Sequence, residues 1–138
     1  MDVVFLIGRI LFASLFLLSG FGHFAKREML VGYSKAAGTP IPEVGVPLAG
    51  AMIIAGAISI AFGIWADVGA LLIVAFLIPT NYYMHAFWAI EDPMESQMQQ
   101  THFMKNTALL GGAIIIFWLF NTGQDLPLTV TNALFGRF

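Results

Sequence analysis

Four long runs of apolar residues, separated by shorter polar stretches, dominate the chain. They cover about residues 3–22, 44–65, 68–90 and 103–120. An α-helix needs about 20 apolar residues to cross a bilayer, and no run shows the strict alternation of a membrane-spanning β-strand. The pattern therefore predicts one all-α integral membrane domain over residues 1–138, a polytopic four-helix bundle.

The polar connections between these runs differ in length. The first, residues 23–43, has apolar residues near helical spacing with Lys26 and Arg27 beside them, which predicts a short interfacial helix in the first loop. Only Ala66 and Asp67 separate the second and third runs, so we expect an antiparallel hairpin there. The third connection, residues 91–102, predicts another interfacial turn. The tail, residues 121–138, has too short an apolar run to span and is predicted to lie on the surface.

Composition agrees with a membrane location and removes several classes of function. Hydrophobic residues make up 59% of the chain and charged residues 10%, whereas soluble domains carry about 25% charged residues. This composition therefore argues strongly against a soluble enzyme. Six Lys or Arg residues form no basic patch, which argues against nucleic acid as a partner. The chain has no cysteine, so disulfides, cysteine-ligated metals and iron–sulfur clusters are excluded.

An even number of spans predicts that both termini lie on the same side of the membrane. The basic residues of the first and third loops are Lys26, Arg27, Lys35 and Lys105. The other side carries only Arg9, inside the first span, and Arg137. The positive-inside rule therefore predicts that loops one and three are cytoplasmic.

Ionisable and strongly polar residues inside the spans are the first candidates for a functional site. Arg9 lies about two turns into the first span. It either extends its side chain to the near interface or anchors a ligand or a partner's carboxylate. In the third span, Pro79 predicts a kink, and Asn81, His85 and Trp88 follow it on one helical face. That face is either part of a structural kink or a polar opening in the bundle.

The predicted topology brings all three histidines to one face of the membrane. His23 ends the first span, His85 lies near the end of the third, and His102 precedes the fourth. Three imidazoles at one end of a bundle can make ordinary interfacial hydrogen bonds, relay protons, bind a quinone carbonyl or ligate a metal. Their spacing matches no specific metal motif, so these alternatives remain open.

Small residues recur at every fourth position of the second span. The ridge is formed by Ala51, Ala55, Ser59 and Gly63. Small side chains let helix backbones approach closely in a bilayer. The ridge predicts either packing inside the bundle or a docking face for other membrane protein subunits.

Several segments in this order resemble the DoxX family of small four-helix membrane proteins. They are GRILFASLFLLSGFGHF near the start, GTPIP in the first loop, glycines 50 and 56, and FMKNTALLGGAII in the last span. The resemblance covers about residues 5–120. It implies a bundle in a prokaryotic cytoplasmic (inner) membrane and relatives such as the membrane subunit of a thiosulfate:quinone oxidoreductase.

The resemblance also implies candidate site residues. Arg9, Lys105 and Asn106 occupy the family's positions for polar groups that organise the bundle interior. With Asn81 and His85 they form the candidate set for binding a cofactor, for which a quinone is the expected class. One departure is that Ile53 stands where relatives often carry an acidic residue, so chemistry that needs this carboxylate is not expected here.

These observations lead to three functional hypotheses. The first is a non-catalytic or quinone-contacting subunit that accompanies a membrane redox enzyme, with the catalytic centre on another chain. The second is a structural accessory or assembly subunit of a larger membrane complex, which would dock through the small-residue ridge. A small transporter is the third and ranks lowest, because the two halves of the chain show no inverted repeat.

Overall fold

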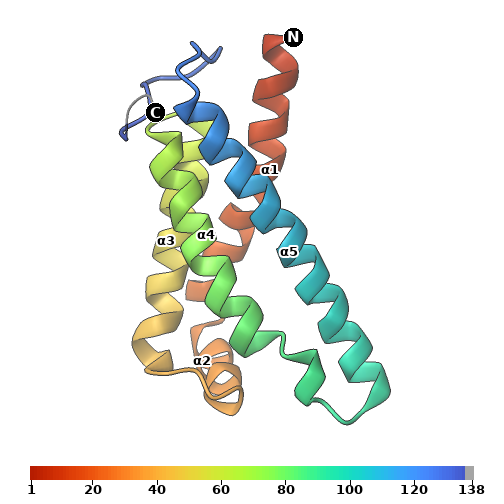
Figure 1. Ribbon diagram of the computed structural model, residues 1–138. Coiled ribbons are helices and arrows are strands. Elements are labelled where there is room, and N and C mark those ends of the chain that lie inside the picture. The colour runs from red at the N-terminus through yellow and green to blue at the C-terminus, as the bar shows by residue number, and fades with distance from the viewer. Residues whose placement is uncertain (136–138) are drawn as a thin grey trace.

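The computed structural model describes residues 1–135 as an assembly of long helices (Figure 1). In chain order these are α1 (Asp2–Ala25), α2 (Arg27–Ala36), α3 (Pro42–Phe62), α4 (Ala66–Met84), the short 3-10 helix η1 (Phe87–Ala89) and α5 (Pro93–Asn121). Four segments are long and apolar enough to cross a membrane: α1, α3, α4 with η1, and α5. The predicted all-α membrane bundle with a short helix in its first loop is confirmed.

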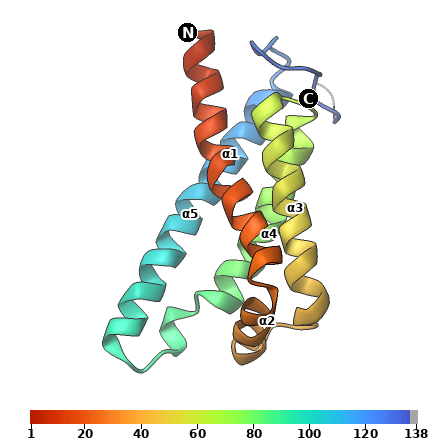
Figure 2. The ribbon, with the colours of Figure 1, turned by 180° about the vertical axis from the view of Figure 1, so that it is seen from behind.

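The long helices pack in the order α1–α3–α4–α5, and α2 lies against α3. Both ends of the described chain lie at the same end of the bundle (Figure 1). Near that end α1 and α5 meet through the rings of Phe5 and Phe120, whose centroids are 6.3 Å apart. Toward the opposite end α1 and α5 diverge (Figure 2). α1 and α5 are therefore closer to each other toward the end that carries the termini than at the opposite end.

Glycines allow the closest helix contacts. A Cβ added to Gly69 of α4 would lie 2.8 Å from the carbonyl oxygen of Gly56 on α3. A Cβ on Gly20 of α1 would lie 3.1 Å from the carbonyl oxygen of Gly50 on α3. Because lipid is as apolar as the side chains, such close backbone packing, rather than hydrophobic burial, holds membrane helices together.

A compact apolar core fills the space between the four long helices. Its buried members are Ala13, Phe16, Ile53, Ala57, Ile60, Ala70, Ile73, Leu77 and Ala113. Many larger apolar side chains remain exposed on the outer faces of α1 and α5, including Leu18 and Trp118. Exposed apolar surface of this extent is what a lipid-facing helix presents.

The start of the last long helix differs from the sequence-based prediction. We expected residues 91–102 to form an interfacial turn, but α5 begins at Pro93, ten residues before the predicted span. The carboxylate of Asp92 accepts a hydrogen bond from the amide of Glu95 at 2.8 Å. Asp at the N-cap followed by Pro at the first helical position is a strong helix start, and it overrides the polar composition of this segment.

Two other boundaries also differ. The predicted third span, residues 68–90, ends as an α-helix at Met84 and continues after a break as η1. The tight turn between α3 and α4 lies at residues 63–65, and Ala66 already belongs to α4. Gly63 ends α3 in the left-handed conformation, with φ 65°, which costs glycine little. The hairpin itself is confirmed.

Candidate ligand-binding cavity

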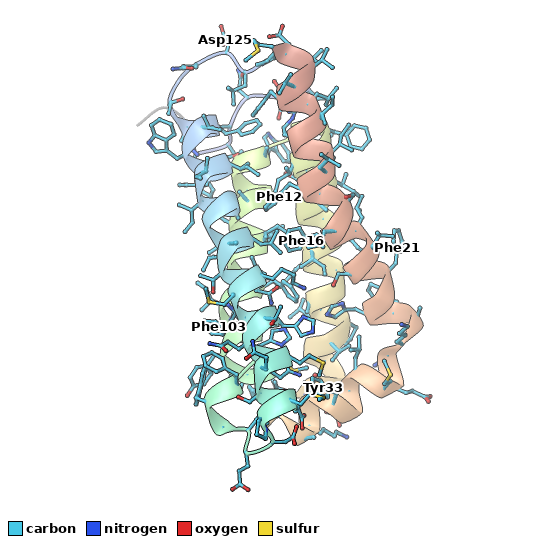
Figure 3. All side chains as sticks on the ribbon, turned by 90° about the vertical axis from the view of Figure 1, so that its right-hand side faces the viewer. Phe12, Phe16, Phe21, Tyr33, Phe103 and Asp125 are labelled. Carbon is cyan, nitrogen blue, oxygen red and sulfur yellow. The ribbon has the colours of Figure 1, made fainter. Side chains whose placement is uncertain are left out.

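A large cavity lies at the end of the bundle opposite the termini. It has a volume of about 570 Å³ and is walled by residues of all five α-helices and of the loop before α3. Ligand pockets commonly have volumes of about 300–1,000 Å³. Most of the wall is apolar, with Phe16, Met52 and Leu77 among its members. Figure 3 shows Tyr33 and Phe103 toward this end and Asp125 at the opposite end.

All three histidines contribute to the wall of this cavity. His85 is the C-cap of α4, and its ring stacks on that of His102 from α5, with centroids 5.3 Å apart. His23 lies on the α1 wall, where a ring nitrogen is 2.8 Å from the carbonyl oxygen of Ser19 and the ring meets Phe76 edge-on. The structure thus pairs two histidines and places the third separately.

The described part of the chain contains no group of three His, Asp or Glu side chains arranged to hold a metal ion. The stacked pair, His85 and His102, offers two imidazoles and no carboxylate beside them. The metal interpretation of His23, His85 and His102 therefore gains no support from residues 1–135.

A hydrogen-bonded chain of side chains links three helices beside the stacked histidines. Nδ1 of His85 is 2.8 Å from Oε1 of Gln99 on α5. The amide nitrogen of Gln99 donates to the Tyr33 hydroxyl of α2 at 3.1 Å. The Tyr33 hydroxyl donates in turn to the main-chain oxygen of Met84 at 3.4 Å. Gln99 is buried, so this chain fixes how the imidazole of His85 is presented to the cavity.

The other polar candidates near the cavity are on α4 and α5. Lys105 and Asn106 line its wall, and Asn106 is buried. Asn81 is also buried and donates to the main-chain oxygen of Phe103 and the hydroxyl of Thr107, both at 3.3 Å. Asn81 does not line the cavity; it joins α4 to α5 directly behind it.

Arg9 is placed away from the other cofactor-binding candidates. It is 2% exposed and donates to the main-chain oxygen of Leu128 in the tail, at the end of the bundle that carries the termini. Its guanidinium also lies 5.0 Å from the centroid of the Phe5 ring. The structure thus brings together His85, Lys105 and Asn106 but not Arg9, whose side chain holds the tail.

The tail itself was predicted to lie on the surface, and the structure shows it folded across the end of the bundle. The amides of Leu134 and Phe135 donate to the carboxylate of Asp67 at 3.1 and 2.9 Å. The amide of Val130 donates to the main-chain oxygen of Gly63 at 3.2 Å. Asp67 is completely buried, so the tail forms part of the packed structure.

Pro79 and the residues after it line or support the cavity. Pro79 and Thr80 contribute to the wall, and the Thr80 hydroxyl donates to the main-chain oxygen of Phe76 at 2.7 Å. The predicted helical face that joins Asn81, His85 and Trp88 is wrong, because α4 ends at Met84. Trp88 lies in η1 and packs against Phe103 with ring centroids 5.8 Å apart.

The small-residue ridge on α3 is divided by the structure. Ala51 and Ala55 are exposed. The hydroxyl of Ser59 donates to the main-chain oxygen of Ile64 at 2.6 Å, and Gly63 is buried beneath Arg9 and Thr129. Half of the ridge therefore serves the chain's own packing, while the other half is open.

Three residues that the sequence analysis did not single out are central to this geometry. Tyr33 lies in the first loop, within the segment predicted as a short interfacial helix. Gln99 fell in a segment predicted as a turn, and Asp67 counted only as a hairpin residue. The Asp92–Pro93 helix start was the available signal for Gln99, because it places residue 99 on a helix that continues past His102.

Comparison with known proteins gives one match. The model of the DoxX family matches residues 4–86, which is more than half of the chain. No curated protein and no solved structure matches.

Proposed function

The chain belongs to the DoxX family, and from this premise we propose that it is a membrane subunit that binds a quinone-class ligand and accompanies a redox enzyme on another chain. The observation that carries the proposal is the cavity of about 570 Å³ between the helices. Its wall combines an apolar surface with imidazoles and a lysine.

A quinone-class ligand suits the chemistry of this wall. It has a planar ring with oxygens at opposite positions and an apolar tail, so it needs an apolar slot with a few polar groups. The His85–His102 stack offers a flat surface of aromatic rings. Lys105 can donate a hydrogen bond to a ring oxygen, and His85 can form one with a ring hydroxyl.

The catalytic centre is proposed to lie on another chain. Stacked imidazoles and a lysine can position a ring and exchange protons with it. Electron transfer needs a redox cofactor, and in this proposal the companion enzyme supplies it. Mild-detergent purification should then recover the protein together with a subunit that carries flavin, haem or an iron–sulfur cluster.

Tryptophan fluorescence tests ligand binding to the cavity directly. Trp88 does not line the cavity, but it packs against Phe103, the sequence neighbour of the lining residue His102, whereas Trp118 lies near the C-terminal end of α5. We would titrate a short-chain ubiquinone analogue into two nanodisc-embedded variants. Trp65→Phe/Trp118→Phe keeps only Trp88, and Trp65→Phe/Trp88→Phe keeps only Trp118.

The expected result is saturable quenching of Trp88 alone. Quinone dissolved in lipid quenches both tryptophans without saturation, so the Trp118 protein controls for partitioning. Equal, unsaturable quenching in the two proteins would overturn quinone binding to this cavity.

A structural accessory role is the second candidate, and the exposed half of the α3 ridge favours it. Ala51 and Ala55 are exposed on one face, and small residues there permit close docking of a partner helix. Ala51→Leu/Ala55→Leu should release the protein from its native complex and leave the bundle folded. Ala108→Leu, at an exposed alanine of α5, is the matched control. Retention of the partner by the double variant would count against this role.

A further inference from the structure

The hydrogen-bonded chain beside the cavity has a direction, and a main-chain carbonyl sets it. Met84 is the last residue of α4, so its carbonyl is one of those left free at a helix end. A carbonyl only accepts, and Tyr33 has a single hydroxyl hydrogen. The Tyr33 hydrogen therefore goes to Met84, over 3.4 Å, and the Tyr33 oxygen is left to accept.

This direction fixes the two remaining groups. The Tyr33 oxygen accepts from the amide nitrogen of Gln99 at 3.1 Å, so the amide oxygen of Gln99 must face His85. At 2.8 Å that oxygen accepts the hydrogen of Nδ1. A neutral imidazole carries one ring hydrogen. Nε2 of His85 is therefore a bare acceptor.

His85 lines the cavity, and the same wall also carries hydrogen-bond donors such as Tyr83 and Asn106. Within residues 1–135, no hydrogen bond from protein to Nε2 of His85 is formed. Its neighbour His102 stacks at 24° between ring planes, so it contacts the face of the His85 ring rather than its Nε2 edge. Lys105 also lines the cavity, and an ammonium can only donate.

From this arrangement we infer that the cavity prefers a ligand that donates a hydroxyl, the reduced dihydroxyaromatic (quinol) form, over the oxidised quinone. The quinol hydroxyl donates to Nε2 of His85, while a ring oxygen accepts from Lys105. A quinone carries only acceptors, so its carbonyl would face the lone pair of His85 without a hydrogen between them. The inference rests on the proposed function and adds to it the redox form that the site selects.

Three ligands with the same ring substituents and tail separate hydrogen-bond donation from ring shape. We would measure binding of decylubiquinol, decylubiquinone and the dimethyl ether of the quinol to the Trp88-only protein in nanodiscs. The buffer is anaerobic at about pH 8, where an ordinary imidazole is neutral. One hydrogen bond to an otherwise unpaired buried group corresponds to about tenfold in affinity. We expect the quinol to bind about tenfold more tightly than either of the other two.

Variants of the chain test whether His85 is the source of the preference. In His85→Asn, the asparagine amide takes the position of Nδ1, and no atom replaces Nε2. The preference for the quinol should therefore disappear while all three ligands still bind. In Gln99→Glu, a carboxylate beside Nδ1 favours the imidazolium, whose Nε2 carries a hydrogen. That variant should bind the quinone more tightly than the quinol. Gln100→Glu, at the next residue and exposed, adds the same charge and should leave the preference unchanged.

The outcomes separate this inference from the proposed function. Equal affinity for quinol and quinone in the wild-type protein would overturn the inference and leave quinone-class binding in place. A preference that survives in His85→Asn would also overturn it. Absence of saturable binding by any of the three ligands would overturn the proposed function itself.

Discussion

The two ends of the bundle use polar residues in opposite ways. At the end that carries the termini, Arg9 and Asp67 are buried and bind main-chain groups of the tail. At the other end, His85 and Lys105 line a cavity of about 570 Å³. We call these the tail end and the cavity end. Arg9 and Asp67 each bind main-chain groups of the tail, whereas His85 and Lys105 contribute to the wall of a cavity.

The difference shows that depth in the membrane alone does not identify a functional site. Ionisable residues in spans are functional candidates by default. By that rule Arg9 was predicted to bind a ligand together with the residues that line the cavity. In the structure its partner is the main-chain oxygen of Leu128, so it acts in folding. Substitutions at the tail end should therefore lower stability, while those at the cavity end should change ligand binding.

The largest effect is expected for Asp67→Ala. The substitution removes the acceptor for two amides, those of Leu134 and Phe135. Hydrogen bonds to a charged group contribute about 1.5–3 kcal/mol each, so we expect a loss of about 3 kcal/mol and faster proteolysis of the tail. Thermal unfolding in detergent and limited proteolysis measure the two effects. Asp125→Ala, at an exposed tail carboxylate, is the control; equal losses in both variants would show that Asp67 does not hold the tail.

A smaller loss is expected for Gly63→Ala, compared with Gly38→Ala. Both glycines have positive φ, 65° and 76°, so both alanines carry the left-handed penalty of about 1 kcal/mol. A Cβ at Gly63 would also lie 2.6 Å from Nη1 of Arg9 and 2.7 Å from Cβ of Thr129, whereas the described residues leave space around Gly38. Chemical denaturation should show that Gly63→Ala lowers the free energy of unfolding by about 1–2 kcal/mol more than Gly38→Ala does. This difference measures the contacts of the turn with Arg9 and the tail. Identical losses of stability in the two variants would mean that the tail does not pack closely against this turn.

Arg9→Met should have a weaker effect than either. It removes the hydrogen bond to Leu128, but it also removes Nε and Nη1, which are buried without a partner among the described residues. Relief from burying these polar atoms offsets part of the lost bond. We expect a net loss of about 1 kcal/mol, measured by the same thermal unfolding. A loss as large as that of Asp67→Ala would show that the guanidinium contributes more than this one bond.

The sequence predicts the frame of the molecule better than its polar contacts. Long apolar runs specify the four spans because a bilayer accepts little else, and helix count alone places both termini at one end. The start of α5 could also have been predicted, since Asp92 and Pro93 form a recognisable helix start. The partners of Arg9 and Asp67 could not be predicted, because they are main-chain groups of the tail. Every residue carries such groups, so they leave no signal in the sequence.

The cavity could be predicted from the sequence only in part. The topology brings His23, His85 and His102 to one end, as the order of the spans predicts. It does not predict which of them pair, because the break after Met84 turns His85 toward His102 and ends the face expected to include Trp88. Tyr33 lines the cavity and is bonded to Gln99, which is 66 residues away in the chain. Such contacts follow from the packing of α2 and α5, which local patterns do not encode.

The smallest effect on stability is expected at the cavity end, for His102→Leu. The ring of His102 stacks on that of His85 at 5.3 Å, is partly exposed, and leucine retains most of the apolar contact. The free energy of unfolding should therefore change by less than about 0.5 kcal/mol, while the affinity for decylubiquinol falls about tenfold because the ligand ring loses its stacked platform. Asp67→Ala should show the reverse, a large loss of stability with ligand affinity unchanged at temperatures where the protein is folded. Measuring unfolding and ligand binding on both variants tests whether the tail end serves stability and the cavity end serves binding. Loss of both stability and ligand affinity in His102→Leu would show that the cavity end, too, is stabilised mainly by its polar side chains.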